Sequence, residues 1–460
     1  MGSRSMHALS LVLPAIVLSA PVVAQPRPSL AVPAARPALA SFPGVLVSPD
    51  GSKLLVMERT APSIDGATGR TFSALVVQPI GRGEIRRLIL PWRARVRSAF
   101  WAPDGDRIGF TILEGHGISL WVGDAYTGVI RMLAGPVLSM ARGEPCQWFH
   151  SGESLLCTLI PADPPEGIAA AGSLRPPGAG QLVVYPVDGN ERRLGQPASF
   201  GEISISPDGN YLVVETAEGG TSSRTEVWDA KSGEVLRVMQ GQGSLDSRTK
   251  QTDAVFSGPR SIEWRGDKPA TLVWVEAQDR GTPAKGAKIR DRLFQLPSPF
   301  TGVPAPFAAL EFRSRGVVWG GDGLAVVSEC WGEPRVARSW IVNPDRASAP
   351  RLLQGLSGRG AEPGSFLTRR KRGGGDVLLT AREGRVAYLL DPSYLDEIDL
   401  ATGRTQRLWR PQAPFREEVV GVIDADERRV IVRRGSASQP ENYFVRDLRK
   451  NKLVALTNFK

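Results

Sequence analysis

The chain has 460 residues, of which 42% are hydrophobic and 23% are charged, and this balance excludes a disordered chain and provides for a large core. The formal net charge is +10, but acidic residues are interspersed with the basic ones in most segments, so no nucleic-acid-binding face is predicted. The one dense basic run, TRRKRGGG at 368–375, lies between strand-like segments and is predicted to be a solvated loop.

Residues 1–24 have the pattern of a secretory signal peptide. Arg4 supplies a short positive region, residues 8–20 are apolar, and Val22-Val23-Ala24 offers small residues for cleavage. A membrane anchor is the alternative, but the apolar run is short for a spanning helix and no later segment is long enough to cross a bilayer. Residues 25–41 are predicted to be a flexible Pro- and Ala-rich lead-in, and the mature chain is expected in the periplasm or outside the cell.

A hairpin pattern then recurs along the chain. FWAPDGDRIGF at 100–110 is an apolar run, a Pro-Asp-Gly corner and a second apolar run, and close copies stand at 46–57 and 204–215. In such a corner Pro presets φ, Asp bonds nearby backbone amides and Gly takes the left-handed conformation. A second hairpin follows each copy, and the same order continues with other corner residues, which gives eight units of about 40 to 50 residues.

This period predicts an all-β protein: a β-propeller of four-stranded blades over residues 42–460, with eight blades, or seven as the alternative because the first unit is irregular. One blade cannot bury both of its faces, so the blades must stack around an axis. Four units carry a tryptophan at or just before the first corner: Trp101, Trp148, Trp264 and Trp319. These large side chains are expected to fill the widening space between blades.

Two of the three cysteines flank one predicted hairpin. If Ser151-Gly152 is a two-residue turn, Cys146 stands directly opposite Cys157. Cross-strand neighbours of this kind are close enough for a disulfide, which an exported protein permits, and two buried thiols are the alternative. Cys330 is then unpaired, and no Cys/His spacing predicts a zinc site.

The sequence offers no recognisable catalytic machinery. It contains no Gly-x-Ser-x-Gly nucleophile elbow and no Gly-rich phosphate loop. His7 leaves with the signal peptide, and His116 and His150 stand in predicted turns, so no Ser-His-Asp triad is expected. The run DADE at 424–427 occupies a corner, where a plain turn is favoured over a cation site. We therefore predict no catalytic residue, no metal and no cofactor.

Several segments are more specific than blade geometry demands: PCQWFHSGESLLC at 145–157, DAVFSGPRSIEWRGDKPATLVWVEA at 253–277, LAVVSECWGEPRVARSWIVNP at 324–344 and PENYFVRDL at 440–448. They resemble the prolyl oligopeptidase family of serine peptidases, specifically its glutamyl endopeptidase-like branch. The resemblance covers residues 42–460. It implies an N-terminal propeller that caps an α/β-hydrolase domain carrying a Ser-Asp-His triad and restricts access to peptides.

Since the sequence ends with the last predicted blade, the hydrolase domain is expected to be absent and no triad residue is carried over. Two functions are open. In the first, the chain is the non-catalytic, substrate-gating propeller of a secreted serine-type, glutamyl-specific endopeptidase, truncated or encoded apart from its hydrolase. In the second, it is a stand-alone periplasmic propeller of the TolB type. The expected partners are a peptide or protein and a separately encoded α/β-hydrolase, with no nucleic acid and no membrane span after signal cleavage.

The resemblance also suggests a binding site. A glutamyl-specific site must pair a carboxylate with a cation, and the planar fork of arginine does this well. Arg93, Arg95 and Arg97 stand at alternate positions of one predicted strand and would share a face. That strand opens the second unit, and first strands of propellers line the central channel, so Arg95 or Arg97 is predicted to bind acidic peptides there. A basic strand end in solvent, or a pocket on the hydrolase, are the alternatives.

Overall fold

The computed structural model divides the chain into two units, Met1–Pro33 and Ala34–Lys460. It describes residues 44–58, 71–115, 117–139, 144–160, 179–219, 222–242, 253–283, 287–321, 323–332, 336–346, 348–358, 365–370, 375–391, 394–426 and 428–459. The first unit, the predicted signal peptide and the predicted lead-in all lie outside these residues. Everything described below belongs to the second unit.

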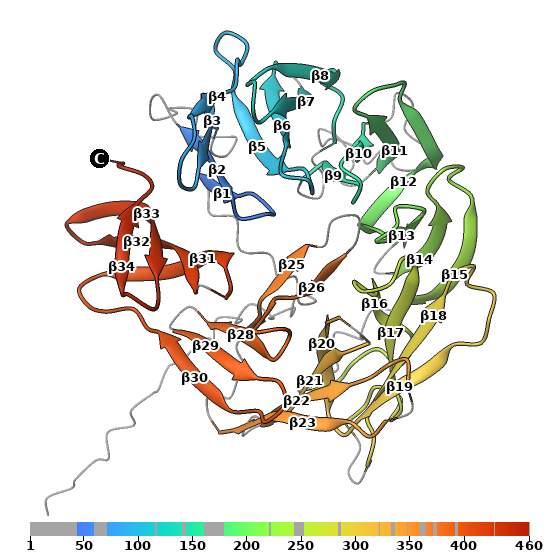
Figure 1. Ribbon diagram of the computed structural model, residues 1–460. Coiled ribbons are helices and arrows are strands. Elements are labelled where there is room, and N and C mark those ends of the chain that lie inside the picture. Colours follow the sequence, from blue (N-terminus) through green and yellow to red (C-terminus); the bar gives the residue numbers. More distant parts are fainter. Residues whose placement is uncertain are drawn as a thin grey trace, which may run out of the picture. The chain divides into compact units, whose positions relative to one another are not determined.

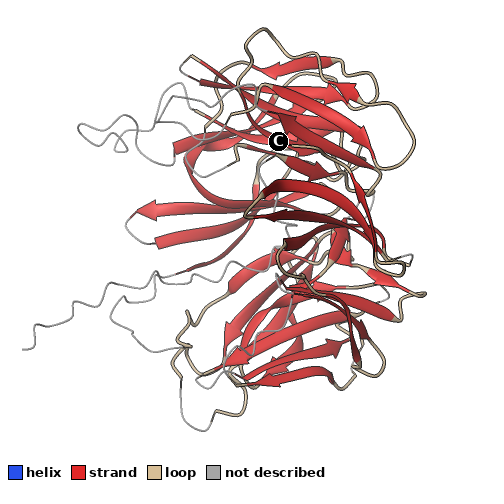
Figure 2. Ribbon diagram, turned by 90° about the vertical axis from the view of Figure 1, so that its left-hand side faces the viewer, coloured by secondary structure: helices blue, strands red, loops and turns tan. Residues whose placement is uncertain are grey.

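The described residues are strands, turns and loops without a helix (Figure 2). They accordingly hold no helix of the length and hydropathy that crossing a membrane requires. The first two sheets contain β1 (Val45–Val47), β2 (Lys53–Glu58), β3 (Ala74–Pro79) and β4 (Arg86–Arg87), then β5 (Val96–Trp101), β6 (Arg107–Glu114), β7 (Gly117–Asp124) and β8 (Ile130–Ala134). A seven-stranded sheet contains β9 (Cys146–Trp148), β10 (Ser154–Leu159), β11 (Ala179–Pro186), β12 (Arg192–Ile205), β13 (Tyr211–Gly219), β14 (Ser222–Asp229) and β15 (Val235–Gln242).

Two more four-stranded sheets contain β16 (Arg260–Trp264), β17 (Thr271–Ala277), β18 (Asp291–Pro297) and β19 (Ala305–Leu310), then β20 (Arg313–Trp319), β21 (Ala325–Trp331), β22 (Val336–Val342) and β23 (Arg351–Ser357). The remaining strands are β24 (Ser365–Phe366), β25 (Thr368–Arg370), β26 (Asp376–Leu378), β27 (Thr380–Ala381), β28 (Val386–Asp391), β29 (Tyr394–Asp399), β30 (Thr405–Trp409), β31 (Arg416–Asp424), β32 (Arg429–Ser436), β33 (Gln439–Asp447) and β34 (Lys452–Ala455). Of these, β31 to β34 form the last four-stranded sheet.

The sheets follow one another in chain order around a ring (Figure 1), which confirms the predicted all-β propeller. The number of blades stays a prediction. One reason is that β12 is continuous through two repeat units: it pairs with β11 in its first half and with β13 in its second. Another is that the strands between Ser365 and Trp409 are divided between a five-stranded and a two-stranded sheet.

Apolar contacts between neighbouring sheets hold the ring together. Each sheet is apolar on both faces, so its residues become buried only when a second sheet covers each face. The same packing joins the two ends of the ring, where Val45 and Val56 of the first sheet lie in one cluster with Ile431 of the last. In addition, Gln78 Nε2 donates a hydrogen bond to Leu456 O at 2.8 Å across this junction.

The tryptophans of the repeat lie between sheets, as the sequence predicts. Trp148, Trp264 and Trp319 are buried. The indole of Trp264 also donates to Ser204 O in the preceding unit, at 3.3 Å, and that of Trp101 donates in the same way to Leu46 O, at 3.3 Å. Trp101 and Trp264 therefore both fill the space between two blades and bond the inner strand of the preceding one, whereas the buried indole nitrogens of Trp148 and Trp319 have no hydrogen-bond partner among the described residues.

The Pro-Asp-Gly corners have the predicted chemistry. Asp104 Oδ1 accepts from Asp106 N at 2.9 Å, and Gly105 has a φ of 75°, the left-handed conformation that other residues adopt only with strain. Successive corners also bond one another. Lys53 Nζ donates to Gly105 O at 3.1 Å, and Arg107 Nη1 donates to Gly152 O at 2.9 Å. Hydrogen bonds thus link the corners of the first three units in series.

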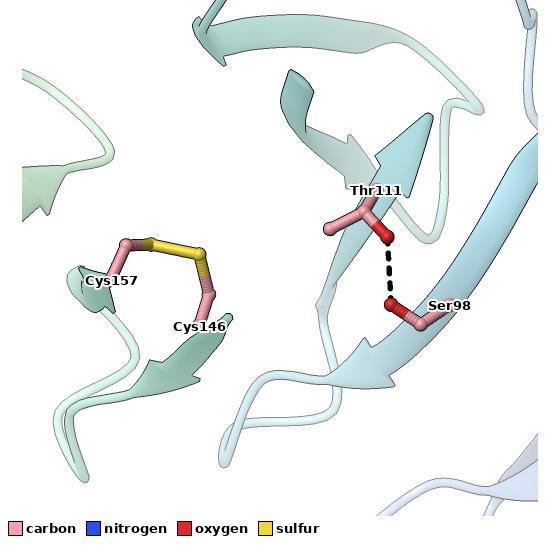
Figure 3. Close-up of a disulfide and its surroundings, with 4 residues drawn as sticks. All are labelled: Ser98, Thr111, Cys146 and Cys157. Atoms are coloured by element: carbon pink, nitrogen blue, oxygen red, sulfur yellow. Dashed lines mark hydrogen bonds between the residues drawn. A yellow bond between two sulfur atoms is a disulfide. The ribbon is translucent and has the colours of Figure 1, made fainter. Parts of the chain in front are cut away.

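The register of the third unit brings two cysteines together. In the β9–β10 hairpin Cys146 is opposite Cys157, and a disulfide joins them with an S–S distance of 2.04 Å (Figure 3). Both residues lie in the apolar cluster between the second sheet and the third unit. Cys330 is buried and free.

Reduction of this disulfide should destabilise the propeller. The crosslink closes a loop with a sequence separation of 11 residues. A loop of this size restricts the unfolded chain enough to stabilise the fold by about 2–3 kcal/mol. We expect the midpoint of thermal unfolding to fall when the wild type is reduced, and to be insensitive to reductant in the variant with both Cys146→Ala and Cys157→Ala. An unfolding midpoint of the wild type that does not change on reduction would contradict this expectation.

Candidate functional site

The inner strands of five repeat units are interrupted by a β-bulge. The first strand of each unit lies on the inner side of its sheet, as Figure 1 shows for β16, β20 and β31. In each bulge the inner strand has one residue more than the strand it pairs with. The register shifts lie between Val96 and Ser98, Phe200 and Ile203, Arg260 and Glu263, Ser314 and Gly316, and Val419 and Gly421.

Charged side chains stand at or beside these bulges, and four of them are here named the bulge residues: Arg97, Glu202, Glu263 and Arg315. Two others are ion-paired, Arg260 with Asp291 and Glu418 with Arg433. A bulge turns a side chain out of the alternation that would pack it against a neighbouring sheet. Accordingly the bulge residues are half-buried or exposed, whereas Val96 and Arg313 beside them are buried. Since the innermost strands of a propeller surround its central channel, the bulge residues border this channel.

The structure separates the three arginines that the sequence places on one strand. β5 begins at Val96, so of the three only Arg97 lies on the strand, and the predicted alternation is wrong. Arg93 belongs to the preceding connection, where it has a φ of 57° and lies 5.7 Å from the ring centre of the exposed Trp92. Arg95 directly precedes the strand, and its carbonyl accepts a hydrogen bond from Leu113 N at 2.9 Å.

Arg97 is the better candidate of the two predicted binding residues. Among the described residues no hydrogen bond or ion pair engages its guanidinium, whereas Arg95 has an interaction of its own. The backbone at Arg97 is held in place by the next residue, because the hydroxyl groups of Ser98 and the buried Thr111 hydrogen-bond across the β5–β6 pair at 2.7 Å (Figure 3). A half-buried cation on a fixed strand is suited to holding an anion.

The acidic bulge residues are less charged than their number suggests. Burial raises the pKa of Glu263 to about 8, and the nearby charge of Glu202 adds to the rise. The Glu263 carboxyl is therefore mostly protonated at pH 7. Among the four bulge residues this leaves Glu202 as the one negative charge beside the positive charges of Arg97 and Arg315. The electrostatic balance at these four positions favours an anionic ligand.

The described residues supply nothing that resembles a catalytic or metal centre. They contain no group of three or more His, Cys, Asp or Glu side chains that could hold a metal ion. His150 Nδ1 lies 3.2 Å from Ser206 O, a contact that links two corners and in which the ring nitrogen must donate. The other candidate, His116, lies outside the described residues.

The sequence patterns do not single out Glu202, Glu263 or Arg315. A weak signal for two of the bulges is a glycine inside a predicted first strand, because glycine within a strand often marks a bulge. Gly201 precedes Glu202, and Gly316 follows Arg315. Neither glycine shows which neighbouring side chain will leave the sheet.

Comparison with known proteins shows which proteins are similar in sequence to this propeller. No family model matches the chain. It is 24% identical over 442 residues to a probable glutamyl endopeptidase, chloroplastic, of Oryza sativa subsp. japonica, a match that covers 80% of this chain and 47% of the relative. It is 26% identical over 446 residues to the protein of the same name from Arabidopsis thaliana, with 80% and 46% covered. The propeller is thus similar in sequence to part of two glutamyl endopeptidases.

This propeller spans about half the length of the two plant relatives it matches. The predicted resemblance to the glutamyl endopeptidase-like branch is thereby confirmed for the propeller region. Among solved structures, a prolyl endopeptidase is similar with a TM-score of 0.46 and 13% identity, over 87% of this chain and 58% of that one.

The raised pKa of Glu263 gives a testable dependence on pH. The pKa of the Glu263 carboxyl is about 8 in the folded protein and 4.5 in its ordinary state. The folded state therefore binds the proton more tightly, which stabilises it fully below pH 4.5. This stabilisation is lost as the pH rises from 4.5 through about 8. Glu263→Gln cannot ionise, so its midpoint of thermal unfolding should fall less than that of the wild type over this range. Partial exposure of the side chain will reduce the effect.

The exposed Glu234 provides the matched control, because Glu234→Gln removes the same charge away from the bulges. Its pH profile of thermal unfolding should follow the wild type. Parallel profiles for Glu263→Gln and Glu234→Gln would show that Glu263 does not occupy the environment described.

Proposed function

We propose that this chain is the non-catalytic, substrate-selecting propeller of a secreted prolyl oligopeptidase-family peptidase, and that it favours acidic peptides on their way to a hydrolase domain. The observation that carries the proposal is Arg97, a half-buried arginine in the bulge of an inner strand, without a hydrogen bond or ion pair to any described residue. The two relatives, both named glutamyl endopeptidases, support an acidic substrate.

The chemistry of the contact follows from the guanidinium group. Its planar fork bonds a carboxylate through two parallel N–H···O contacts, and such charge-assisted bonds contribute about 1.5–3 kcal/mol each. A half-buried position reduces screening by water, so the preference for Glu over Gln should be larger there than on an exposed strand end. Binding should weaken as the salt concentration rises.

The function predicts a specific loss of affinity. Arg97→Ala should raise the Kd for an acidic peptide about tenfold, which corresponds to the loss of about one charge-assisted contact. The Kd for the matching peptide with Gln in place of Glu should change little. Fluorescence anisotropy with labelled peptides at two salt concentrations measures both values. Arg131, an exposed outer-strand arginine that pairs with Asp188 at 3.1 Å, provides the control variant Arg131→Ala.

Equal affinity of wild type and Arg97→Ala for the acidic peptide would exclude Arg97 as the binding residue. A second measurement separates the proposal from the stand-alone TolB-type function. The chain is added to a hydrolase encoded beside it, and turnover of Glu-containing peptides is compared with and without the propeller. Unchanged turnover and unchanged preference between Glu and Gln substrates would favour the stand-alone function.

We also propose that the mature protein is exported to the periplasm or beyond. The apolar segment near Arg4 and the disulfide between Cys146 and Cys157 support an oxidising compartment. Expressed from its own start, the protein should be recovered from the periplasmic or extracellular fraction with Gln25 as its first residue, as read by N-terminal sequencing. Recovery from the cytoplasm with an uncleaved N-terminus would overturn this.

A further inference from the structure

The seventh repeat unit has a small side chain where four other units have a tryptophan. Thr380 and Trp101 precede the corner glycines Gly384 and Gly105 at the same spacing, and the φ angles of these glycines are 81° and 75°. Each is paired with the residue that follows its corner glycine, again at the same spacing. Thr380 therefore occupies the tryptophan position of its unit.

The chain reaches Thr380 through two short strands. The sequence predicts a solvated loop for the basic run at 368–375, but its described part, Thr368–Arg370, is a strand paired with Asp376–Leu378. These strands, β25 and β26, lie inside the ring of sheets in Figure 1, and β26 contacts β20 of the sixth unit. Leu378 thereby belongs to the apolar cluster between the sixth and seventh units.

In other units, large side chains fill the space beside the tryptophan position. Trp264 lies in the apolar cluster between the fourth and fifth units. The fourth unit has Ile205 at this position, and there Phe149 from the corner of the third unit lies in the same cluster. At the junction of the sixth and seventh units both positions carry little side chain, since Thr380 replaces the tryptophan and Gly320 stands where Phe149 stands in its corner.

The space at this junction is open as a pocket of about 570 Å³. Its apolar walls come from both units: Leu324 and Ile341 from the sixth, and Leu378 and Leu400 from the seventh. The first two are only half-buried, whereas the other two are buried. Pockets of this size with mainly apolar walls and a few polar groups are typical of sites for small ligands.

One wall of the pocket corresponds to a wall that faces a tryptophan elsewhere. In the corner of the fourth unit Tyr211 O accepts a hydrogen bond from Ser206 N at 2.9 Å, and in that of the sixth unit Leu324 O accepts from Gly320 N at 2.7 Å. Tyr211 packs against the cluster that contains Trp264. Leu324 is thus the counterpart of a residue that borders an indole, and it lines the open space instead.

Three polar side chains also line the pocket: Asn343, Thr380 and Glu383. Within the part of the chain that the structure describes, no hydrogen bond or ion pair engages the Thr380 hydroxyl or the Glu383 carboxylate. Both groups can accept a hydrogen bond, and the carboxylate disfavours an anionic ligand. The polar part of the lining is therefore suited to a ligand that donates an N–H or O–H.

We propose that this pocket binds an aromatic ring that carries an N–H or O–H donor, in the space that a tryptophan fills at other junctions. The ring comes from a free aromatic molecule or from a tryptophan or tyrosine side chain of a peptide, because both present the same planar group. The site belongs to the sixth and seventh units and does not rest on the proposed selection of acidic peptides.

The experiment titrates the mature full-length chain with indole and follows binding by ligand-observed NMR. The wild type should bind indole saturably, with a Kd of about 1 mM or tighter for a ring of this size. Thr380→Trp places in the pocket the side chain that fills the equivalent space in other units. It should raise the Kd for indole about tenfold or more, and it should raise the midpoint of thermal unfolding.

Thr405→Trp is the matched control, because Thr405 is exposed on β30, an outer strand of the same sheet. This variant should bind indole as the wild type does. If Thr380→Trp fails to fold, Gly321→Leu decides. Gly321 lines the pocket and is exposed, and a Cβ there meets no atom within 4 Å, so its new side chain should take up room and weaken indole binding.

Two further ligands define the chemistry and the source of the ring. N-methylindole keeps the ring but has no N–H, and it should bind the wild type about three- to tenfold more weakly than indole. Equal affinity of the two would overturn the requirement for a donor. A blocked Ala-Trp-Ala peptide that binds more tightly than indole identifies a peptide side chain as the ligand, and weaker binding of the peptide identifies a free aromatic molecule.

The outcomes are separate from those of the proposed function. Absence of saturable binding of both indole and the peptide by the wild type would overturn the site. An unchanged Kd for indole in a folded Thr380→Trp or in Gly321→Leu would do the same, because the ring would then bind elsewhere. None of these results depends on Arg97, whose role is measured with acidic peptides.

Discussion

The structure depends on one constraint: each sheet is apolar on both faces and becomes stable only between two others. The ring satisfies this through apolar clusters between neighbouring units, including the junction of the two ends, where Val45 and Val56 pack against Ile431 of the last sheet. The same constraint decides where polar chemistry can be placed. On the inner strands, side chains that follow the alternation face the neighbouring sheets, so bulges and insertions provide the positions at which a charged group leaves this packing.

Three arginines on or inserted into the inner strands occupy such positions. Arg97 and Arg315 leave the alternation at bulges, and Arg369 is carried by a hairpin inserted into an inner strand. None of the three is neutralised within the part of the chain that the structure describes, while burial and Glu202 hold the Glu263 carboxyl mostly protonated at neutral pH. The buried ionic groups behave differently. Arg265, for example, is bonded by Asp267 and Asp345, both at 2.7 Å, and serves the packing of two units.

This contrast separates structural from functional charge. A buried ion pair needs both partners because either alone would leave an unpaired charge in the core. A cation bordering the channel has no such requirement, because solvent or a ligand can satisfy it. The unneutralised arginines, together with relatives named glutamyl endopeptidases, are the reason why acidic peptides are proposed as ligands of this propeller.

The sequence by itself determined the features that depend on near neighbours. The corner at Asp104 and Gly105, the hairpin register at Ser151-Gly152 and the interblade tryptophans all follow from local turn chemistry and side-chain size. Only the tertiary structure decided which arginines border the channel. Arg97 differs from Arg93 through the start of a strand and a bulge, and the space beside Thr380 stays open because neither side of the junction between the sixth and seventh units fills it. These depend on contacts between distant segments, for which sequence spacing carries no signal.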